Sequence, residues 1–232
     1  MRTATRKVNL LTLIGVLFFS SAGGTFAQYT QHKERSPQSQ SDADVQEDPA
    51  ARKLLEEARS NRAPWKNFPG FQAEVIFKEN GQTHKGEIDI DLKGQVQVAM
   101  HTFEIQKRVG RIMHSIVSHR LEKSSSEGEK KHILTLGPDD GHKAGQRIDI
   151  HGDDMGSYYR IKDKQIRQVN RTIGDIKFTI NVIETRQITA GTFLPKRFEV
   201  LTYDVASGKL LKKEKHHTLF TRVENFYLPK NR

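Results

Sequence analysis

The sequence contains no cysteine. This absence excludes disulfides, thiol chemistry, thiolate metal sites and iron–sulfur clusters. It also excludes a lipoprotein anchor, which requires a cysteine at the cleavage point. Small exported domains often depend on disulfides for stability. A folded domain in this chain must therefore be stabilised by burial of apolar side chains.

Catalytic and metal-binding signatures are also missing. The chain has no Gly-x-Ser-x-Gly elbow, no His-Glu-x-x-His motif, no P-loop ending and no EF-hand spacing. His114 and His119 are five residues apart, which is not the same-face spacing of a helix. His216 and His217 are adjacent and point to opposite faces of a strand. The sequence therefore predicts no metal site and no cofactor.

Acidic residues are fewer than basic ones. The chain has 38 Lys and Arg against 28 Asp and Glu, a formal net charge of +10. One interpretation is attraction to an anionic surface of the cell envelope; the other is a set of solvated strand faces. No nucleic-acid motif is present, so no nucleic-acid partner is expected. The late basic residues form two groups: Arg160, Lys162, Lys164, Arg167, Arg171 and Lys177, then Lys209, Lys212, Lys213 and Lys215.

The first 27 residues have the pattern of a secretory signal peptide. Arg2 and Arg6 provide a cationic start, residues 8–19 are apolar, and Thr25 to Ala27 supplies small residues before Gln28. We expect cleavage after Ala27 and export to the periplasm or the extracellular space. An uncleaved anchor is the alternative, but such a segment needs about 20 apolar residues, and polar and small residues interrupt this run.

Residues 28–47 are polar and of low complexity, which predicts a disordered leader. A single α+β domain is predicted over residues 48–232. Asp48 followed by Pro49 is typical of a helix start, and Ala51, Leu54, Leu55 and Ala58 recur at helical spacing.

The following residues alternate with a period of two. Asn80-Gly81 predicts a hairpin and Lys93-Gly94 a second turn. A second amphipathic helix is predicted over 101–120, with Ile112 and Ile116 buried against the sheet. The fold expected is α+β: a large curled antiparallel sheet, half-barrel-like, with both helices on its concave face. Further strands are predicted over 131–136, 146–151, 157–162, 165–173, 177–187, 195–204 and 209–223.

One group of polar residues is a candidate binding site. His119 and Arg120 end the second predicted helix, and Tyr159, Asn170 and Arg171 lie on neighbouring predicted strands. Guanidinium groups, an amide and an aromatic ring suit a polar or anionic head group. The alternative is that these residues only bond the helix end to the sheet.

Six segments of the sequence carry a resemblance to a known family: Ala51–Ala58, Arg62–Phe71, His119-Arg120, Gly156–Arg160, Gln165–Arg171 and Leu194-Pro195. They resemble an uncharacterised bacterial family, a domain of unknown function seen chiefly in cyanobacterial and related proteins. The resemblance extends over nearly all of residues 50–229, and it implies no activity and no catalytic residues.

The order of elements is similar, more loosely, to the LolA-like periplasmic lipoprotein carriers. That resemblance implies an apolar hollow beneath a curled sheet, suited to acyl chains. It is an analogy of layout, not of motif. The residues expected to line the hollow are Phe71, Val75, Phe77, Ile88 and Ile90.

The sequence therefore favours a non-enzymatic exported protein of the cell envelope that binds a lipid or another amphiphile. Two alternatives stay open. One is a hydrolase-like enzyme in which His119, Arg120 and Tyr159 act on a polar substrate. The other is a structural or partner-binding module.

Overall fold

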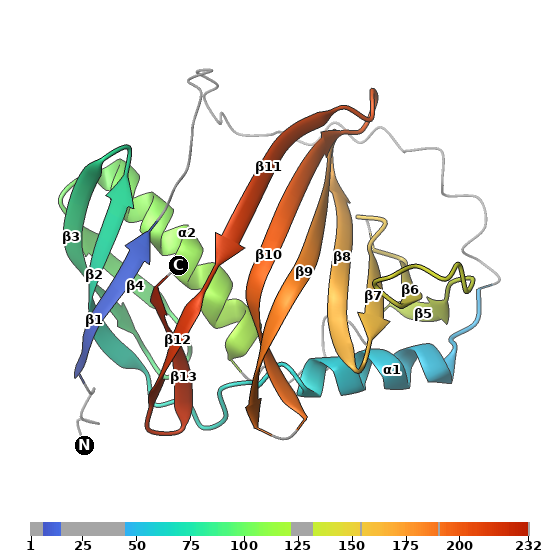
Figure 1. The fold of residues 1–232 in the computed structure, drawn as a ribbon, viewed down its shortest axis with the longest axis horizontal. Helices are drawn as coiled ribbons and strands as arrows, with labels where there is room; N and C mark the ends of the chain where they lie inside the picture. The colour runs from blue at the N-terminus through green and yellow to red at the C-terminus, as the bar shows by residue number, and fades with distance from the viewer. Residues whose placement is uncertain (1–6, 15–44, 122–131, 154, 190, 232) are drawn as a thin grey trace.

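The computed structural model shows an α+β protein (Figure 1) and describes residues 7–14, 45–121, 132–153, 155–189 and 191–231. These ranges contain two helices, a six-stranded sheet and a seven-stranded antiparallel sheet that does not close into a barrel. The predicted fold class is confirmed. One difference is that the strands form two sheets, whereas the sequence analysis expected one sheet with both helices on it.

The six-stranded sheet combines both ends of the chain. The strands joined by the two predicted turns, at Asn80-Gly81 and Lys93-Gly94, are neighbours in this sheet in the order in which they follow along the chain. Its order is β12 (Leu219–Val223), β13 (Phe226–Asn231), β1 (Lys7–Ile14), β2 (Phe71–Glu79), β3 (Gln82–Ile90) and β4 (Val96–Met100).

Strand β1 lies within the predicted signal peptide and pairs in parallel with β2 and β13. Removal of the signal peptide, which stays a prediction, would remove this strand. Strand β2 would then keep β3 as its partner, and β13 would keep β12.

Within the described part of the chain, no helix has the length and apolar character needed to cross a bilayer.

The β2–β3 hairpin confirms the turn predicted at Asn80-Gly81. Both residues have positive φ, 49° and 77°, as a two-residue turn between twisted strands requires. Asparagine tolerates this conformation better than most residues, and glycine adopts it without steric cost. The turn places Glu79 opposite Gln82 and fixes the register of the whole hairpin.

Helix α1 spans Pro49–Ser60 and begins as predicted. The Asp48 carboxylate accepts hydrogen bonds from the backbone N–H groups of Ala50 (2.8 Å) and Ala51 (3.4 Å). One residue earlier, Glu47 accepts a hydrogen bond from the Leu134 N–H at 2.8 Å and pairs with Arg52. The last residue of the predicted leader, Glu47, therefore already contacts the domain. Residues 28–44 of the leader lie outside the described part of the chain.

Helix α2 spans Phe103–Arg120. The prediction that Ile112 and Ile116 are its buried residues is corrected. Both are half-buried at the border of the core, because the buried stripe follows a spacing of four residues that is rotated away from them. The buried residues are Ile105, Val109, Met113, Val117 and Arg120.

The seven-stranded sheet follows the order of the chain. Each of its strands pairs antiparallel with the next, from one edge to the other. The strands are β5 (Ile133–Leu136), β6 (Gln146–His151), β7 (Tyr158–Lys162), β8 (Gln165–Ile173), β9 (Ile176–Thr189), β10 (Thr192–Asp204) and β11 (Leu210–His217).

The segment 209–223, predicted as one strand, is two strands in different sheets. Strand β11 ends at His217, and the N–H of buried Thr218 donates to the Lys196 carbonyl at 2.8 Å. Strand β12 then pairs with β13. The alternation of side chains along 209–223 does not show where the chain passes from one sheet to the other. That point depends on pairing with strands elsewhere in the chain.

Each helix covers its own sheet and forms a separate core. The buried residues of α2 pack with β2 and β3, and those of α1 pack with β5, β6 and β7. Phe71, Val75, Phe77, Ile88 and Ile90 are all buried in the α2 core. The residues expected to line a hollow therefore form a packed interior with α2.

Candidate functional site

The register of the seven-stranded sheet assigns its side chains to two faces, because directly opposed residues of paired strands share a face. Tyr159 lies in the α1 core, so its face is called the helix face. The row on the helix face is Ile148, Tyr159, Val169, Ile180 and Val200. The adjacent row, on what is called the polar face, is Arg147, Arg160, Gln168, Asn181 and Glu199.

Helix α1 covers only part of the helix face. Its main contacts are with β5, β7 and β8. The apolar side chains farther along this face, toward the other edge of the sheet, are half-buried or exposed and belong to neither core. They are called the apolar strip: Ile173, Ile176, Phe178, Ile180, Val182, Phe198 and Val200.

Tyr159 and Arg171 meet at the border between α1 and the apolar strip. The Arg171 guanidinium donates to the Tyr159 hydroxyl at 2.8 Å, and the Arg59 guanidinium lies over the Tyr159 ring at 5.7 Å. The tyrosine ring is buried. Because its oxygen accepts from Arg171, its own O–H proton is left to donate to another group.

The Nε atom of Arg171 is buried and has no hydrogen-bond partner among the described residues. A buried donor without a partner costs about 1–3 kcal/mol, so such groups are rare in folded proteins and call for an explanation. Arg171 is the cross-strand partner of Phe178. An unsatisfied cationic donor therefore lies directly beside the apolar strip.

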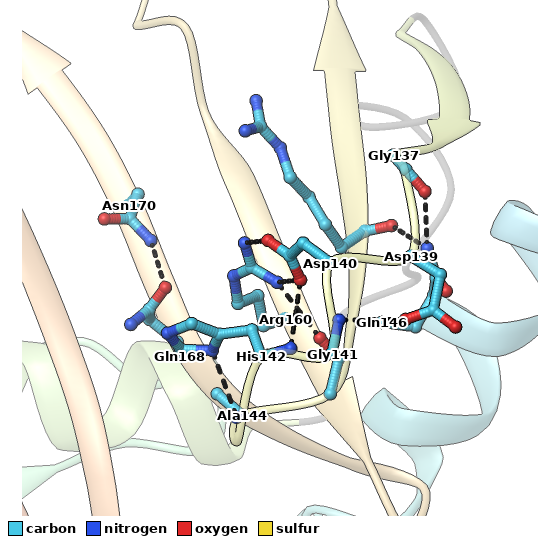
Figure 2. Close-up of polar contacts among 12 residues, drawn as sticks. Gly137, Asp139, Asp140, Gly141, His142, Ala144, Gln146, Arg160, Gln168 and Asn170 are labelled. Atoms are coloured by element: carbon cyan, nitrogen blue, oxygen red, sulfur yellow. Dashed lines mark hydrogen bonds and ion pairs between the residues drawn. The ribbon is translucent and has the colours of Figure 1, made fainter.

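Asn170 lies on the polar face. Its Nδ2 donates to Gln168 Oε1 at 2.9 Å, its Oδ1 accepts from Thr179 Oγ1 at 2.6 Å, and Gln168 Nε2 donates to Asn181 Oδ1 at 2.8 Å. Figure 2 shows Asn170 and Gln168 side by side on this face. The amide is therefore part of a satisfied network, on the side of the sheet opposite Tyr159.

An ion pair extends the polar face toward the loop between β5 and β6 (Figure 2). The Arg160 guanidinium donates to both Asp140 carboxylate oxygens, at 2.9 and 2.5 Å, and to the Gly145 carbonyl at 3.2 Å. The hydrogen bonds from Arg160 lower the pKa of Asp140 from 3.8 to about 2. This pairing ties the loop to the sheet.

His119 and Arg120 lie at the end of α2, against the other core. Exposed His119 hydrogen-bonds through Nδ1 with the Ser115 carbonyl of its own helix, at 2.6 Å. Buried Arg120 donates to the Ala63 carbonyl at 3.1 Å and lies over Trp65 at 5.1 Å. Burial lowers the pKa of Arg120 to about 10. Arg120 thus connects α2 to the segment after α1, whereas the described hydrogen bond of His119 to Ser115 stays within α2.

Of the five candidate residues, the structure brings Tyr159 and Arg171 together on one face. The sequence analysis missed the apolar strip and Arg59. The alternation of Phe178, Ile180 and Val182 was a usable signal, since it identifies an apolar face of a strand. The alternation does not show which element packs on that face.

A metal site would require several ligating side chains close together among the described residues. These residues contain no group of three or more His, Asp or Glu side chains placed to hold a metal ion. What the Arg171 region offers is a cation, a hydroxyl donor and an adjoining apolar surface. This arrangement suits the binding of an anionic group attached to a hydrocarbon.

Comparison with known proteins identifies a family. Residues 46–232 match the family described as "Protein of unknown function (DUF3386)". The chain belongs to this family. The match spans both sheets and both helices, apart from strand β1. No curated protein and no solved structure gives a significant match, so the DUF3386 assignment adds no activity, and the function must be argued from the site.

Proposed function

We propose that this DUF3386 protein is an exported, non-enzymatic protein of the cell envelope that binds an anionic amphiphile. The ligand lies on the helix face of the seven-stranded sheet, with its hydrocarbon on the apolar strip and its head group at Arg171 and Tyr159. The signal-peptide pattern of the first 27 residues supports export.

The observation that carries the proposal is the unsatisfied Nε of Arg171 beside the apolar strip. A carboxylate or phosphate would satisfy this donor and would also accept from the Tyr159 hydroxyl. Charge-assisted hydrogen bonds of this kind are short and strong. The cost of the buried donor in the free protein is then recovered when the ligand binds.

The apolar strip supplies the second half of the site. Phe178 and Val182 are half-buried and belong to neither core, so an alkyl chain has apolar surface to cover. Each buried methylene contributes about 0.8 kcal/mol. Binding should therefore strengthen with chain length and show a negative heat-capacity change.

Titration calorimetry with dodecanoate and 1-dodecanol, which share the same chain length, tests the proposal. The native protein should bind dodecanoate more tightly. Arg171→Ala should weaken dodecanoate binding roughly tenfold or more, since hydrogen bonds to charged groups contribute about 1.5–3 kcal/mol, and should leave 1-dodecanol binding nearly unchanged.

Arg197→Ala is the matched control. Arg197 lies on β10 but forms an ion pair with Glu184 on the exposed surface, so its removal should not affect either ligand. Tyr159→Phe removes the second donor and keeps the ring. The proposal fails if neither ligand binds, or if Arg171→Ala and Arg197→Ala weaken both ligands equally.

A further inference from the structure

We propose that two hairpin tips of the seven-stranded sheet dock on an anionic lipid bilayer. One tip joins β8 to β9 through Gly174-Asp175, and the other joins β10 to β11 through residues 205–209. The N–H of Val205 donates to the Asp175 carbonyl at 2.9 Å. The two tips therefore form one continuous end of the sheet, and Figure 1 shows this end away from α1.

Aliphatic side chains are exposed on this end of the sheet. Ile173 and Leu211 keep 58% and 52% of their surface in contact with solvent, and Val205, Leu210 and Ile176 keep 49%, 46% and 36%. Single exposed aliphatic residues are common, but a gathering of five at one end of a domain marks an interaction site. Two of them, Ile173 and Ile176, are also the last residues of the apolar strip on this side.

The tips carry a small excess of positive charge. Residues 173–177 and 204–214 contain four lysines against two aspartates and one glutamate. Lys212 and Lys213 pair with Glu214 and Glu199. Lys177 and Lys209 border the two turns directly, and the Asp204 carboxylate accepts hydrogen bonds from the N–H and hydroxyl of Ser207.

This chemistry fits a bilayer better than a protein partner. Interfaces between proteins are enriched in aromatic residues and depleted in lysine, whereas the tips combine aliphatic residues with lysine. At a membrane surface, lysine chains lie along apolar groups and place their ammonium groups among anionic head groups. Each basic residue near such a surface strengthens binding severalfold.

Docking in this orientation would bring the open end of the apolar strip to the bilayer. Arg171 pairs with Phe178, two residues from Ile173 and Ile176, which corresponds to roughly 7 Å along a strand. An amphiphile leaving the bilayer would then meet the strip and Arg171 directly. This last step rests on the proposed function, whereas docking at the tips does not.

Flotation with vesicles tests the docking. The purified protein should float with vesicles that contain phosphatidylglycerol and not with pure phosphatidylcholine vesicles, and added salt should release it. Lys177→Glu with Lys209→Glu should lower the partition coefficient by tenfold or more, on the order expected for two reversed charges. Ile173→Ser with Leu211→Ser should lower it similarly, by removing the apolar contact.

Two controls match these variants. Ile183→Ser changes an isoleucine of β9 with a similar exposure, 53%, and Lys85→Glu reverses an exposed lysine on the six-stranded sheet. Both should float like the native protein, and circular dichroism should show that every variant is folded. Docking is overturned if the native protein does not float, or if the controls lose flotation as much as the tip variants.

Flotation and calorimetry together separate the two proposals. Arg171→Ala should lose dodecanoate affinity but keep flotation, whereas Lys177→Glu with Lys209→Glu should keep dodecanoate affinity and lose flotation. If Arg171→Ala has no effect on dodecanoate but the tip variants fail to float, the docking stands and the amphiphile site fails. The reverse pattern supports the amphiphile site and overturns the docking.

Discussion

The two sheets differ in how completely a helix covers them. Helix α2, with 18 residues, packs its buried stripe against β2 and β3 and closes a core whose central side chains have almost no exposure. Helix α1, with 12 residues, packs mainly on β5, β7 and β8. The six-stranded sheet therefore has a filled core, whereas the seven-stranded sheet also has half-buried apolar side chains on β9 and β10 that belong to neither core.

The two sheets also differ in how fully the arginine beside each core is hydrogen-bonded. In the α2 half, buried Arg120 is satisfied by the Ala63 carbonyl and the Trp65 ring. In the α1 half, Arg171 reaches Tyr159 but leaves Nε without a partner among the described residues. Two arginines beside aromatic rings thus have different roles: Arg120 holds the structure together, and Arg171 is proposed to hold a ligand.

Truncation of core side chains should show the largest contrast. Met113 is fully buried in the α2 core, so Met113→Ala should lower the free energy of unfolding by about 2–5 kcal/mol. Val200→Ala, on the apolar strip, should lower it less, by about 1 kcal/mol, because the Val200 side chain is only partly buried. Urea denaturation measures both; equal losses would mean that the strip is packed as tightly as the core.

The two helix starts offer a second, smaller contrast. Asp48 caps α1 through its side chain, whereas Thr102 makes no side-chain hydrogen bond at the start of α2. Asp48→Ala should therefore cost about 0.5–2 kcal/mol of stability, and Thr102→Ala much less. Thermal unfolding of the two variants compares them directly, and an equal effect would contradict the capping geometry.

The smallest effect concerns the pH dependence of the Asp140–Arg160 ion pair. Its carboxylate has a pKa of about 2 in the folded protein against 3.8 when unpaired. The pair therefore contributes its full stabilisation above pH 3.8 and loses it as the pH falls through about 2. The melting temperature of Asp140→Asn should lie below that of the native protein at neutral pH and converge with it toward pH 2.

Asp139→Asn is the control for this titration. Asp139 lies in the same loop and accepts a hydrogen bond from the Gly141 N–H, but it forms no described ion pair. Asp139→Asn should therefore lower the melting temperature at neutral pH less than Asp140→Asn does. If the difference in melting temperature between Asp140→Asn and the native protein stayed constant down to pH 2, the ion pair would not be the source of the stabilisation.

Local patterns predicted most of the elements. The bounds 146–151 and 165–173 agree with β6 and β8, and Asp48 begins α1 as expected. These features depend on neighbouring residues: alternation along a strand, a cap, or a two-residue turn. The sequence is sufficient to predict an element when the interactions that determine it lie within a few residues.

The division into two sheets and the composition of the site depend on distant partners. Nothing in 209–223 indicates that the chain changes sheets at Thr218. Likewise, His119 and Arg120 were grouped with Tyr159 because all three fit one chemistry, but helix α2 places the first two against the other core. Pairing between strands decides which side chains meet, and a single sequence does not display it.

The central claim is that ligand binding takes place on the apolar strip and not in the α2 core. Methyl NMR of the protein during titration with dodecanoate tests it most directly. The methyl signals of Ile180, Val182 and Val200 should shift with a common affinity, while those of Ile88 and Ile90, buried in the α2 core, should stay in place. Shifts confined to Ile88 and Ile90, or no shifts at all, would contradict the account.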